Sequence, residues 1–140
     1  MKGYTFHGGD LFHRGHLHQL IECRKHCDYL IAGVLTDAAL ASYKRRPIIP
    51  YLWRAAIYEA IIHVDEVVMQ DSRDPTENLR LYKPDILFHG DDWDDIPGTE
   101  WMVAHGGKVI KTPHFHDIST TKIIEAIQNG NVCNHPCCDG

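Results

Sequence analysis

The sequence predicts an α/β fold: a single Rossmann-like, doubly wound parallel sheet of five strands with helices on both faces. Short apolar runs alternate with segments of helical periodicity over the whole chain, as is typical of repeated strand–helix units. The run at 28–36 is continuously apolar, which is expected of a parallel strand buried on both faces. No repeat or low-complexity linker interrupts this pattern, so we expect one domain over residues 1–130 and a flexible tail at 131–140 that contains cysteine and histidine.

The first strand is predicted at 4–6 and the first helix at 17–27, with a glycine-containing turn between them. The strand at 28–36 follows that helix, so a right-handed crossover should place it beside the first strand. Asp37 is then expected to cap a short helix that ends at Ala41.

The next helix is predicted at 51–63, because Pro50 precedes it and proline suits the start of a helix. Apolar residues repeat in it at helical spacing, at Leu52, Ala56, Ala60 and Ile61. In the rest of the chain, proline and glycine mark the ends of helices that alternate with apolar strands. These elements are expected at 66–69, 75–82, 85–89, 99–105, 108–111 and 119–129.

The net charge of the chain limits the kinds of partner that it can bind. The formal net charge is −5 at pH 7, so neither nucleic acid nor an anionic membrane surface is an expected partner. No signal-peptide pattern is present and no run approaches the roughly 20 apolar residues of a membrane span, so we expect a cytoplasmic protein. Any anion site must therefore be a local concentration of cations and histidines, and the most basic segment is 42–47.

Two histidines stand at the turn after the first strand. A glycine turn between a strand and a helix points backbone N–H groups at a phosphate, and this turn carries His13 and His16 on either side of Gly15. Glycine lets the backbone approach a ligand closely. Histidine can donate a hydrogen bond without a fixed charge, which suits the stabilisation of a transferring phosphoryl group. The alternative interpretation is an ordinary helix start with two solvated histidines.

Three polar segments follow predicted strands: 7–16, 90–93 and 114–121. Ligands of open parallel sheets bind beyond the carboxyl ends of the strands, where the strand order reverses. We therefore expect these three segments to meet in one crevice, with the basic segment nearby.

The sequence resembles the small cytidylyltransferases, a family that includes the bacterial glycerol-3-phosphate enzymes and the choline-phosphate enzymes. The resemblance is carried by the H-x-G-H motif at 13–16 and by Ile-Ser-Thr-Thr at 118–121. Segments 35–37, 41–44 and 83–93 are further similar to the cytidylyltransferase domains of phosphonate pathways. The resemblance implies that CMP is transferred from CTP to a small phosphonate or phosphate monoester, with 2-hydroxyethylphosphonate favoured, and that pyrophosphate is released. It also implies Mg²⁺ bound through the triphosphate, and a homodimer.

The resemblance further implies roles for individual residues. His13, His16 and Lys44 are the expected catalytic residues, with Lys44 holding the acceptor against the α-phosphate. Nucleotide contacts are expected from His7, Gly8, Gly9, Gly15, Asp91, His114, Ile118, Ser119, Thr120 and Thr121. Acceptor contacts are expected from Asp10, Lys44, Arg54, Asp92 and Trp93, and Asp10 is also the candidate protein ligand of Mg²⁺. The alternatives are ordinary ones: helix-capping hydroxyls, a solvated loop and a surface arginine.

The chain departs from the family pattern in two places. The family commonly has Gly-Thr-Phe-Asp before the first histidine, where this chain has His-Gly-Gly-Asp at 7–10. The family also commonly has an arginine shortly before Ile-Ser-Thr-Thr, where this chain has His-Phe-His-Asp at 114–117. His114 is the positional substitute and His116 a second candidate. Histidine is a weaker cation, so we expect a lower and pH-dependent affinity for the triphosphate.

Other functions stay open at this point. They are cytidylyl transfer to glycerol 3-phosphate, adenylyl transfer to a sugar phosphate, and a non-catalytic nucleotide-binding module. Metal storage is disfavoured because the histidines are scattered. Among the five cysteines, Cys23 and Cys27 lie one helical turn apart and fit core packing or a helix surface, whereas the spacing in the tail matches no common zinc motif. The tail residues are Cys133, His135, Cys137 and Cys138.

Overall fold

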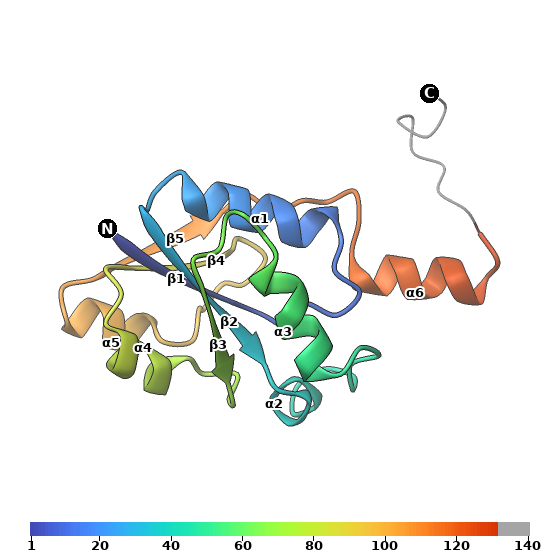
Figure 1. The fold of residues 1–140 in the computed structure, drawn as a ribbon, viewed down its shortest axis with the longest axis horizontal. Helices are drawn as coiled ribbons and strands as arrows, with labels where there is room; N and C mark the ends of the chain where they lie inside the picture. The colour runs from blue at the N-terminus through green and yellow to red at the C-terminus, as the bar shows by residue number, and fades with distance from the viewer. Residues whose placement is uncertain (132–140) are drawn as a thin grey trace.

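Five parallel strands form one sheet in the computed structural model, which describes residues 1–131 (Figure 1). The strands are β1 (Lys2–His7), β2 (Tyr29–Leu35), β3 (Glu66–Gln70), β4 (Ile86–Gly90) and β5 (Lys108–Thr112). The helices are α1 (Arg14–Arg24), α2 (Asp37–Ala41), α3 (Tyr51–Glu59), α4 (Thr76–Tyr82), α5 (Thr99–Ala104) and α6 (Thr120–Gln128). The predicted α/β class and five-stranded parallel sheet are confirmed.

The sheet order is β3-β2-β1-β4-β5, so the chain reverses its direction of travel across the sheet between β1 and β4. Residues of β1 pair with β2 on one side, where His7 faces Val34, and with β4 on the other, where Thr5 faces Phe88. The predicted pairing of the first two strands is therefore confirmed. The carboxyl ends of β1 and β4 flank the reversal, which is where ligands of such sheets bind.

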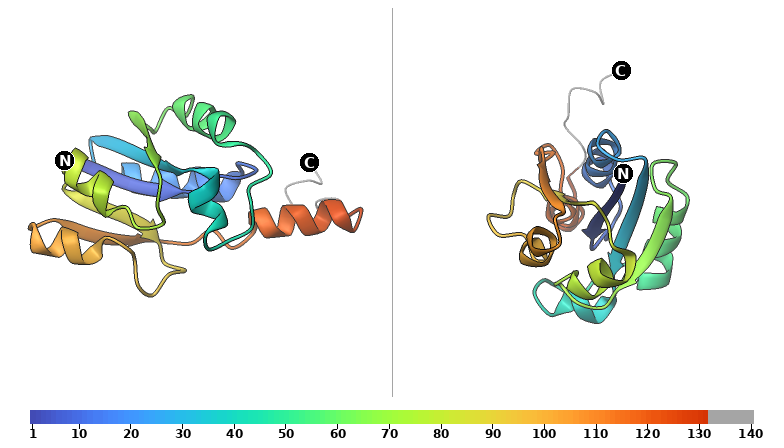
Figure 2. Two further views of the ribbon diagram at one scale, coloured as in Figure 1. Left: turned by 90° about the horizontal axis from the view of Figure 1, so that it is seen from below. Right: turned by 90° about the vertical axis from the view of Figure 1, so that its left-hand side faces the viewer.

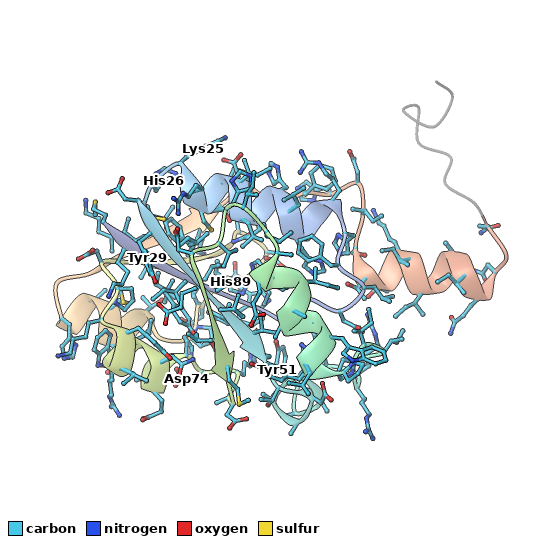
Figure 3. The ribbon with its side chains drawn as sticks, in the orientation of Figure 1. Lys25, His26, Tyr29, Tyr51, Asp74 and His89 are labelled. Atoms are coloured by element: carbon cyan, nitrogen blue, oxygen red, sulfur yellow. The ribbon has the colours of Figure 1, made fainter. Side chains whose placement is uncertain are left out.

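Helices cover both faces of the sheet, and the strands alternate between two cores (Figure 2). Tyr4 and Phe6 of β1 join the core under α2, α4 and α5. On the other face, Leu20 of α1 and Tyr58 of α3 pack on alternate residues of β2. The period of two along a strand gives each face its own set of apolar side chains. His89, near the end of β4, is half-buried, whereas Lys25 and His26 are exposed at one edge of the molecule (Figure 3).

Two helix starts differ from the prediction. Helix α1 begins at Arg14 with His13 as its N-cap, so His16 lies in the first turn of the helix. Helix α2 is capped by Thr36, whose Oγ1 accepts the N–H of Ala39 at 3.2 Å, and the prediction that Asp37 is the cap was wrong. Threonine one residue earlier has the extended backbone that a cap requires.

Helix α3 also differs from the prediction, because it ends at Glu59 and its buried residues are Arg54, Ala55 and Tyr58. Leu52 is 75 % exposed. Leu52 and Ala56 therefore lie on the exposed side of α3, whereas Ile61 follows the helix and packs against the core. The homodimer expected from the resemblance stays a prediction.

Helix α6 projects from one end of the sheet, and none of its residues is buried (Figures 1 and 2). Cys23 and Cys27 are buried thiols of the core, as predicted. The predictions for Cys133, Cys137 and Cys138 lie outside the described residues. No helix within residues 1–131 is long and apolar enough to cross a membrane.

Candidate functional site

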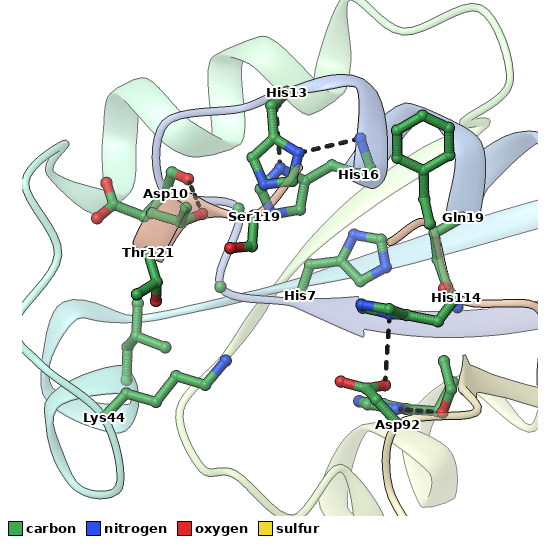
Figure 4. A pocket seen from close by; sticks show the side chains of 18 of the residues that line it. His7, Asp10, His13, His16, Gln19, Lys44, Asp92, His114, Ser119 and Thr121 are labelled. Atoms are coloured by element: carbon green, nitrogen blue, oxygen red, sulfur yellow. Dashed lines mark hydrogen bonds and ion pairs between the residues drawn. The ribbon is translucent and has the colours of Figure 1, made fainter. Parts of the chain in front are cut away.

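A pocket of about 490 Å³ opens at the carboxyl ends of β1 and β4 (Figure 4). The three polar segments expected to meet do line it together, with the basic segment beside them. The residues singled out in the sequence that line it are His7, Gly8, Gly9, Asp10, His13, Gly15, His16, Lys44, Asp92, Trp93, His114, Ile118, Ser119, Thr120 and Thr121. His116 is exposed and does not line the pocket.

Two predicted contact residues, Arg54 and Asp91, do not line the pocket. Arg54 is fully buried. Its guanidinium donates to the carbonyls of Ile49 (2.8 Å), Leu35 (2.8 Å) and Gly8, and to Asp37 (2.7 Å). These hydrogen bonds connect the turn after β1 to β2 and to the loop before α3, and Arg54 does not line the pocket.

Asp91 likewise holds the chain in place. Its Oδ1 accepts the N–H of His114 at 3.0 Å. The loop after β4 is thereby joined to the segment that leads into α6, and His114 is held on the pocket wall.

His13 and His16 form a reciprocal capping box at the start of α1. The N–H of Gly15 donates to Nδ1 of His13 at 3.0 Å, and the N–H of His13 donates to Nδ1 of His16 at 3.2 Å. A neutral imidazole whose Nδ1 accepts must carry its proton on Nε2. The backbone therefore fixes both rings as uncharged Nε2–H donors.

The environment keeps these histidines neutral. Burial lowers the pKa of His13, and burial lowers the pKa of His16 to about 2, with smaller contributions from His7, His13 and Lys44. Burial also lowers the pKa of His7 to about 3. At neutral pH His7, His13 and His16 are therefore uncharged, and His13 and His16 offer Nε2–H donors.

His7 is held by both ring nitrogens. Nδ1 lies 2.8 Å from the hydroxyl of Tyr58, and Nε2 lies 3.3 Å from Oγ1 of Thr5. Gly9, next in the turn, has a φ of +69°, and a Cβ there would lie 2.5 Å from Cε2 of Tyr58. The turn can thus lie against Tyr58 only because Gly9 has no side chain.

The opening turn and α6 are in direct contact. Oγ1 of Thr120 donates to the carbonyl of Asp10 at 2.8 Å, and Arg45 reaches Oγ1 of Thr121 at 3.4 Å. The carboxylate of Asp10 accepts the N–H groups of Ile48 and Ile49, both at 2.9 Å. Hydrogen bonds therefore hold the turn after β1, the basic loop and the start of α6 together on one side of the pocket.

These contacts bear on the expected Mg²⁺. Both carboxylate oxygens of Asp10 already accept backbone N–H groups. Within residues 1–131, no group of three or more His, Cys, Asp or Glu could hold a metal ion. The pocket residues do not form a metal site of their own, and Mg²⁺ carried by triphosphate oxygens and water stays a prediction.

Lys44 extends into the pocket opposite the histidines (Figure 4). Desolvation lowers the pKa of its ammonium group, and the charges of Arg45 and Arg73 act in the same direction, while Asp92 opposes them. Asp92 also lies 4.0 Å from His114. Lys44 and Arg45 thus bring two cations to a lining that also contains the carboxylates of Asp10 and Asp92.

Sequence reasoning missed several pocket residues. Gln19 lies three residues after His16 on α1, and its buried Nε2 has no hydrogen-bond partner among the described residues. The i, i+3 spacing from His16 was the available signal. Tyr43 and His89 also line the pocket, where the His89 ring stacks on Trp93 at 4.2 Å between centroids.

Comparisons with known proteins agree with this geometry. The cytidylyltransferase-like family profile matches residues 9–126. A bifunctional protein HldE of Alcanivorax borkumensis is 37 % identical over 123 residues, which cover 85 % of this chain and 26 % of that protein. A bifunctional protein HldE of Caulobacter sp. (strain K31) is 34 % identical over 126 residues, which cover 87 % of this chain and 26 % of that protein. The chain thus spans about a quarter of the length of these relatives.

A solved structure supports the fold. It is a lipopolysaccharide core biosynthesis protein from Thermoplasma volcanium, with a TM-score of 0.74 and 22 % sequence identity. The match covers 82 % of this chain and 98 % of that one. At this level of identity the similarity concerns the arrangement of strands and helices alone.

Proposed function

The chain belongs to the cytidylyltransferase-like family of nucleotidyltransferases, and from that premise we propose that it transfers CMP from CTP to a small phosphonate or phosphate monoester and releases pyrophosphate. The observation that carries the proposal is that the H-x-G-H motif at 13–16 and the Ile-Ser-Thr-Thr motif at 118–121 lie together in the fold. The capping box of α1 and the first turn of α6 line the same pocket, and Thr120 donates to the carbonyl of Asp10 at 2.8 Å.

The reaction is an in-line displacement at phosphorus. An oxygen of the acceptor forms a bond to the α-phosphorus, and the bond between that phosphorus and the oxygen bridging to the β-phosphorus breaks. The bridging oxygen leaves on pyrophosphate with the bonding electrons. A phosphonate or phosphate oxygen is already ionised near neutral pH, so the enzyme needs no general base, and catalysis comes from positioning and charge stabilisation.

The residues of the pocket divide this work. The Nε2–H groups of His13 and His16 donate to phosphoryl oxygens, on which charge develops during the transfer. Ser119 and Thr121 stand at the N-terminus of α6, where hydroxyls and helix N–H groups stabilise the departing phosphates. Lys44 neutralises the repulsion between the acceptor and the α-phosphate. When bound to the triphosphate, Mg²⁺ would neutralise part of its charge.

Nucleotide choice rests on the resemblance to the small cytidylyltransferases. Gln19 supports binding of the nucleoside in its part of the pocket. Its Nε2 has no hydrogen-bond partner among the described residues, and a base carbonyl or a ribose hydroxyl could accept a hydrogen bond from it. A second candidate, adenylyl transfer to a sugar phosphate, is supported by the similarity to the HldE proteins.

The test is a panel of CTP and ATP, each offered with 2-hydroxyethylphosphonate, glycerol 3-phosphate and a sugar phosphate. Pyrophosphate release gives the rate, and mass spectrometry identifies the nucleotidylated acceptor. We expect CTP with the phosphonate to give the highest kcat/KM. ATP with the sugar phosphate as the best pair would establish the second candidate, and nucleotide binding without pyrophosphate release from any pair would establish a non-catalytic module.

A matched pair of variants ties the activity to the pocket. Lys44→Met removes an ammonium group that lines the pocket. Arg46→Met removes a cation of the same loop, but Arg46 does not line the pocket. Only Lys44→Met should lower turnover, by about a hundredfold or more, as is typical of a group that stabilises developing charge. Equal losses in the two variants would contradict the assigned role of Lys44.

A further inference from the structure

Arg73 lies in the loop that follows β3, and its guanidinium is held between two aromatic rings of the pocket. Its Cζ is 4.9 Å from the centroid of Tyr43 and 4.6 Å from the centroid of Trp93. Both distances are within the range of a cation–π interaction. Over residues 1–131, Arg73 makes no ion pair, so these two rings are its partners.

The two rings are themselves fixed in place. Tyr43 and Trp93 meet edge to face with their centroids 6.2 Å apart. Trp93 also stacks on His89 at 4.2 Å and meets Phe6 at 6.2 Å. Since Tyr43 and Trp93 both line the pocket, they form two walls of an aromatic cage at its rim.

Cages of this kind bind quaternary ammonium groups in other proteins. Here the chain fills the cage with a cation of its own. A ligand with a cationic end would have to displace Arg73 from both rings and would also be repelled by its positive charge.

The neighbouring charges strengthen this exclusion. Lys44 lines the pocket beside Tyr43, and the charge of Arg73 contributes to lowering the pKa of Lys44 and of His89, although desolvation is the larger cause for each. The nearby carboxylates are engaged: Asp92 faces His114 at 4.0 Å and acts on Lys44, and Asp91 accepts the N–H of His114. Among the described lining residues, a cationic ligand would therefore have to share the carboxylate of Asp92 with Lys44 and His114.

We propose that Arg73 determines acceptor specificity by occupying the cage of Tyr43 and Trp93, so that the pocket takes small phosphonates or phosphate monoesters whose far end is neutral or anionic and rejects those whose far end is cationic. The guanidinium edge keeps N–H donors for a hydroxyl or a carboxylate at that end of the acceptor. This inference rests on the proposed nucleotidyl transfer and names the acceptor class within it.

The kinetic test compares acceptors of similar size with different far ends: 2-hydroxyethylphosphonate, 2-aminoethylphosphonate and phosphocholine. The variants are Arg73→Ala, Arg73→Lys, and Arg80→Ala as the matched control, because Arg80 is exposed and forms a surface ion pair with Glu77. We expect Arg73→Ala to shift the ratio of kcat/KM for phosphocholine over the hydroxyl acceptor by about tenfold or more in favour of phosphocholine, as expected when a cage is vacated. Arg73→Lys, which keeps the charge, should shift it less, and Arg80→Ala should leave it unchanged.

A wild-type preference for phosphocholine or 2-aminoethylphosphonate would overturn the proposal, as would an unchanged ratio in Arg73→Ala. A binding measurement separates this failure from a failure of the proposed function. Tetramethylammonium titrated into the protein, followed by NMR shifts of the indole N–H signals, should perturb Trp93 in Arg73→Ala but not in wild type. That result supports the filled cage even if no nucleotide is transferred, and absence of binding to Arg73→Ala would refute the cage itself.

Discussion

Replacing Arg54 with methionine should destabilise the protein far more than replacing any surface arginine. The guanidinium is fully buried and donates to the carbonyls of Gly8, Leu35 and Ile49 and to the carboxylate of Asp37. Methionine has a similar length and fills most of the space, but it donates no hydrogen bond.

The magnitude follows from the groups left behind. A buried carbonyl that loses its donor costs about 1–3 kcal/mol, and three carbonyls lose the same donor. Asp37 is 39 % exposed and returns to water, so its ion pair adds little. We expect a loss of about 3–5 kcal/mol in the free energy of unfolding, within the range measured when one partner of a buried ionic network is removed. Domains of this size have about 5–15 kcal/mol in total, so the variant should fold and be measurable.

Urea denaturation followed by circular dichroism measures this loss through the midpoint, and an unchanged m-value shows that the same surface is exposed. Arg80→Met is the control, because Arg80 is exposed and forms a surface ion pair with Glu77, and it should change stability by about 0.5 kcal/mol or less. A loss below about 1 kcal/mol in Arg54→Met would refute this structural role, because the buried carbonyl of Leu35 alone should cost about that much when it loses its donor.

Three further predictions concern the histidines. His16→Ala should lower kcat/KM by about 10²–10³-fold, because it removes a fixed Nε2–H donor, while exposed His105→Ala should leave steady-state rates unchanged. Gly15→Ala places a methyl group 2.8 Å from Cε1 of His13, and disruption of this cap should cost about 1–2 kcal/mol in thermal or urea unfolding; wild-type stability with wild-type activity would contradict the capping box. His7 has a pKa of about 3 when folded and an ordinary one when unfolded, so between these values the unfolded chain binds more protons and stability falls as pH falls from about 6.5 toward 3. Urea midpoints at pH 4–7 should show this fall, and His7→Gln should make it shallower.

The fold was predictable because its signals are local. The continuous apolar strand at 29–35, the glycine turn before α1 and the proline before α3 each act within a few residues. Parallel pairing of β1 and β2 then follows from the handedness of the crossover. The errors were also local: α1 begins three residues earlier than predicted, because the side chain of His13 serves as its cap.

Arg54 and Arg73 show what sequence reasoning could not reach. Arginine is rarely buried, and the partners of Arg54 are carbonyls from three separate segments that come together only in the fold. Arg73 stands in an exposed loop with no pattern of its own, and its ring partners are 30 residues before it and 20 residues after it in the sequence. By contrast, the convergence of the opening turn with the start of α6 could be predicted, because both follow strands whose carboxyl ends share one edge of a parallel sheet.

The projection of α6 would make binding of the proposed triphosphate substrate and the order of this helix one coupled equilibrium. Its first turn contributes hydroxyls to the pocket, yet none of its residues is buried, so it belongs to the least protected part of the described chain. A triphosphate that bridges α1 and α6 would slow amide exchange along α6, far from any atom it touches. By linkage, whatever covers the outer part of α6 would tighten the hold on the triphosphate by the same factor.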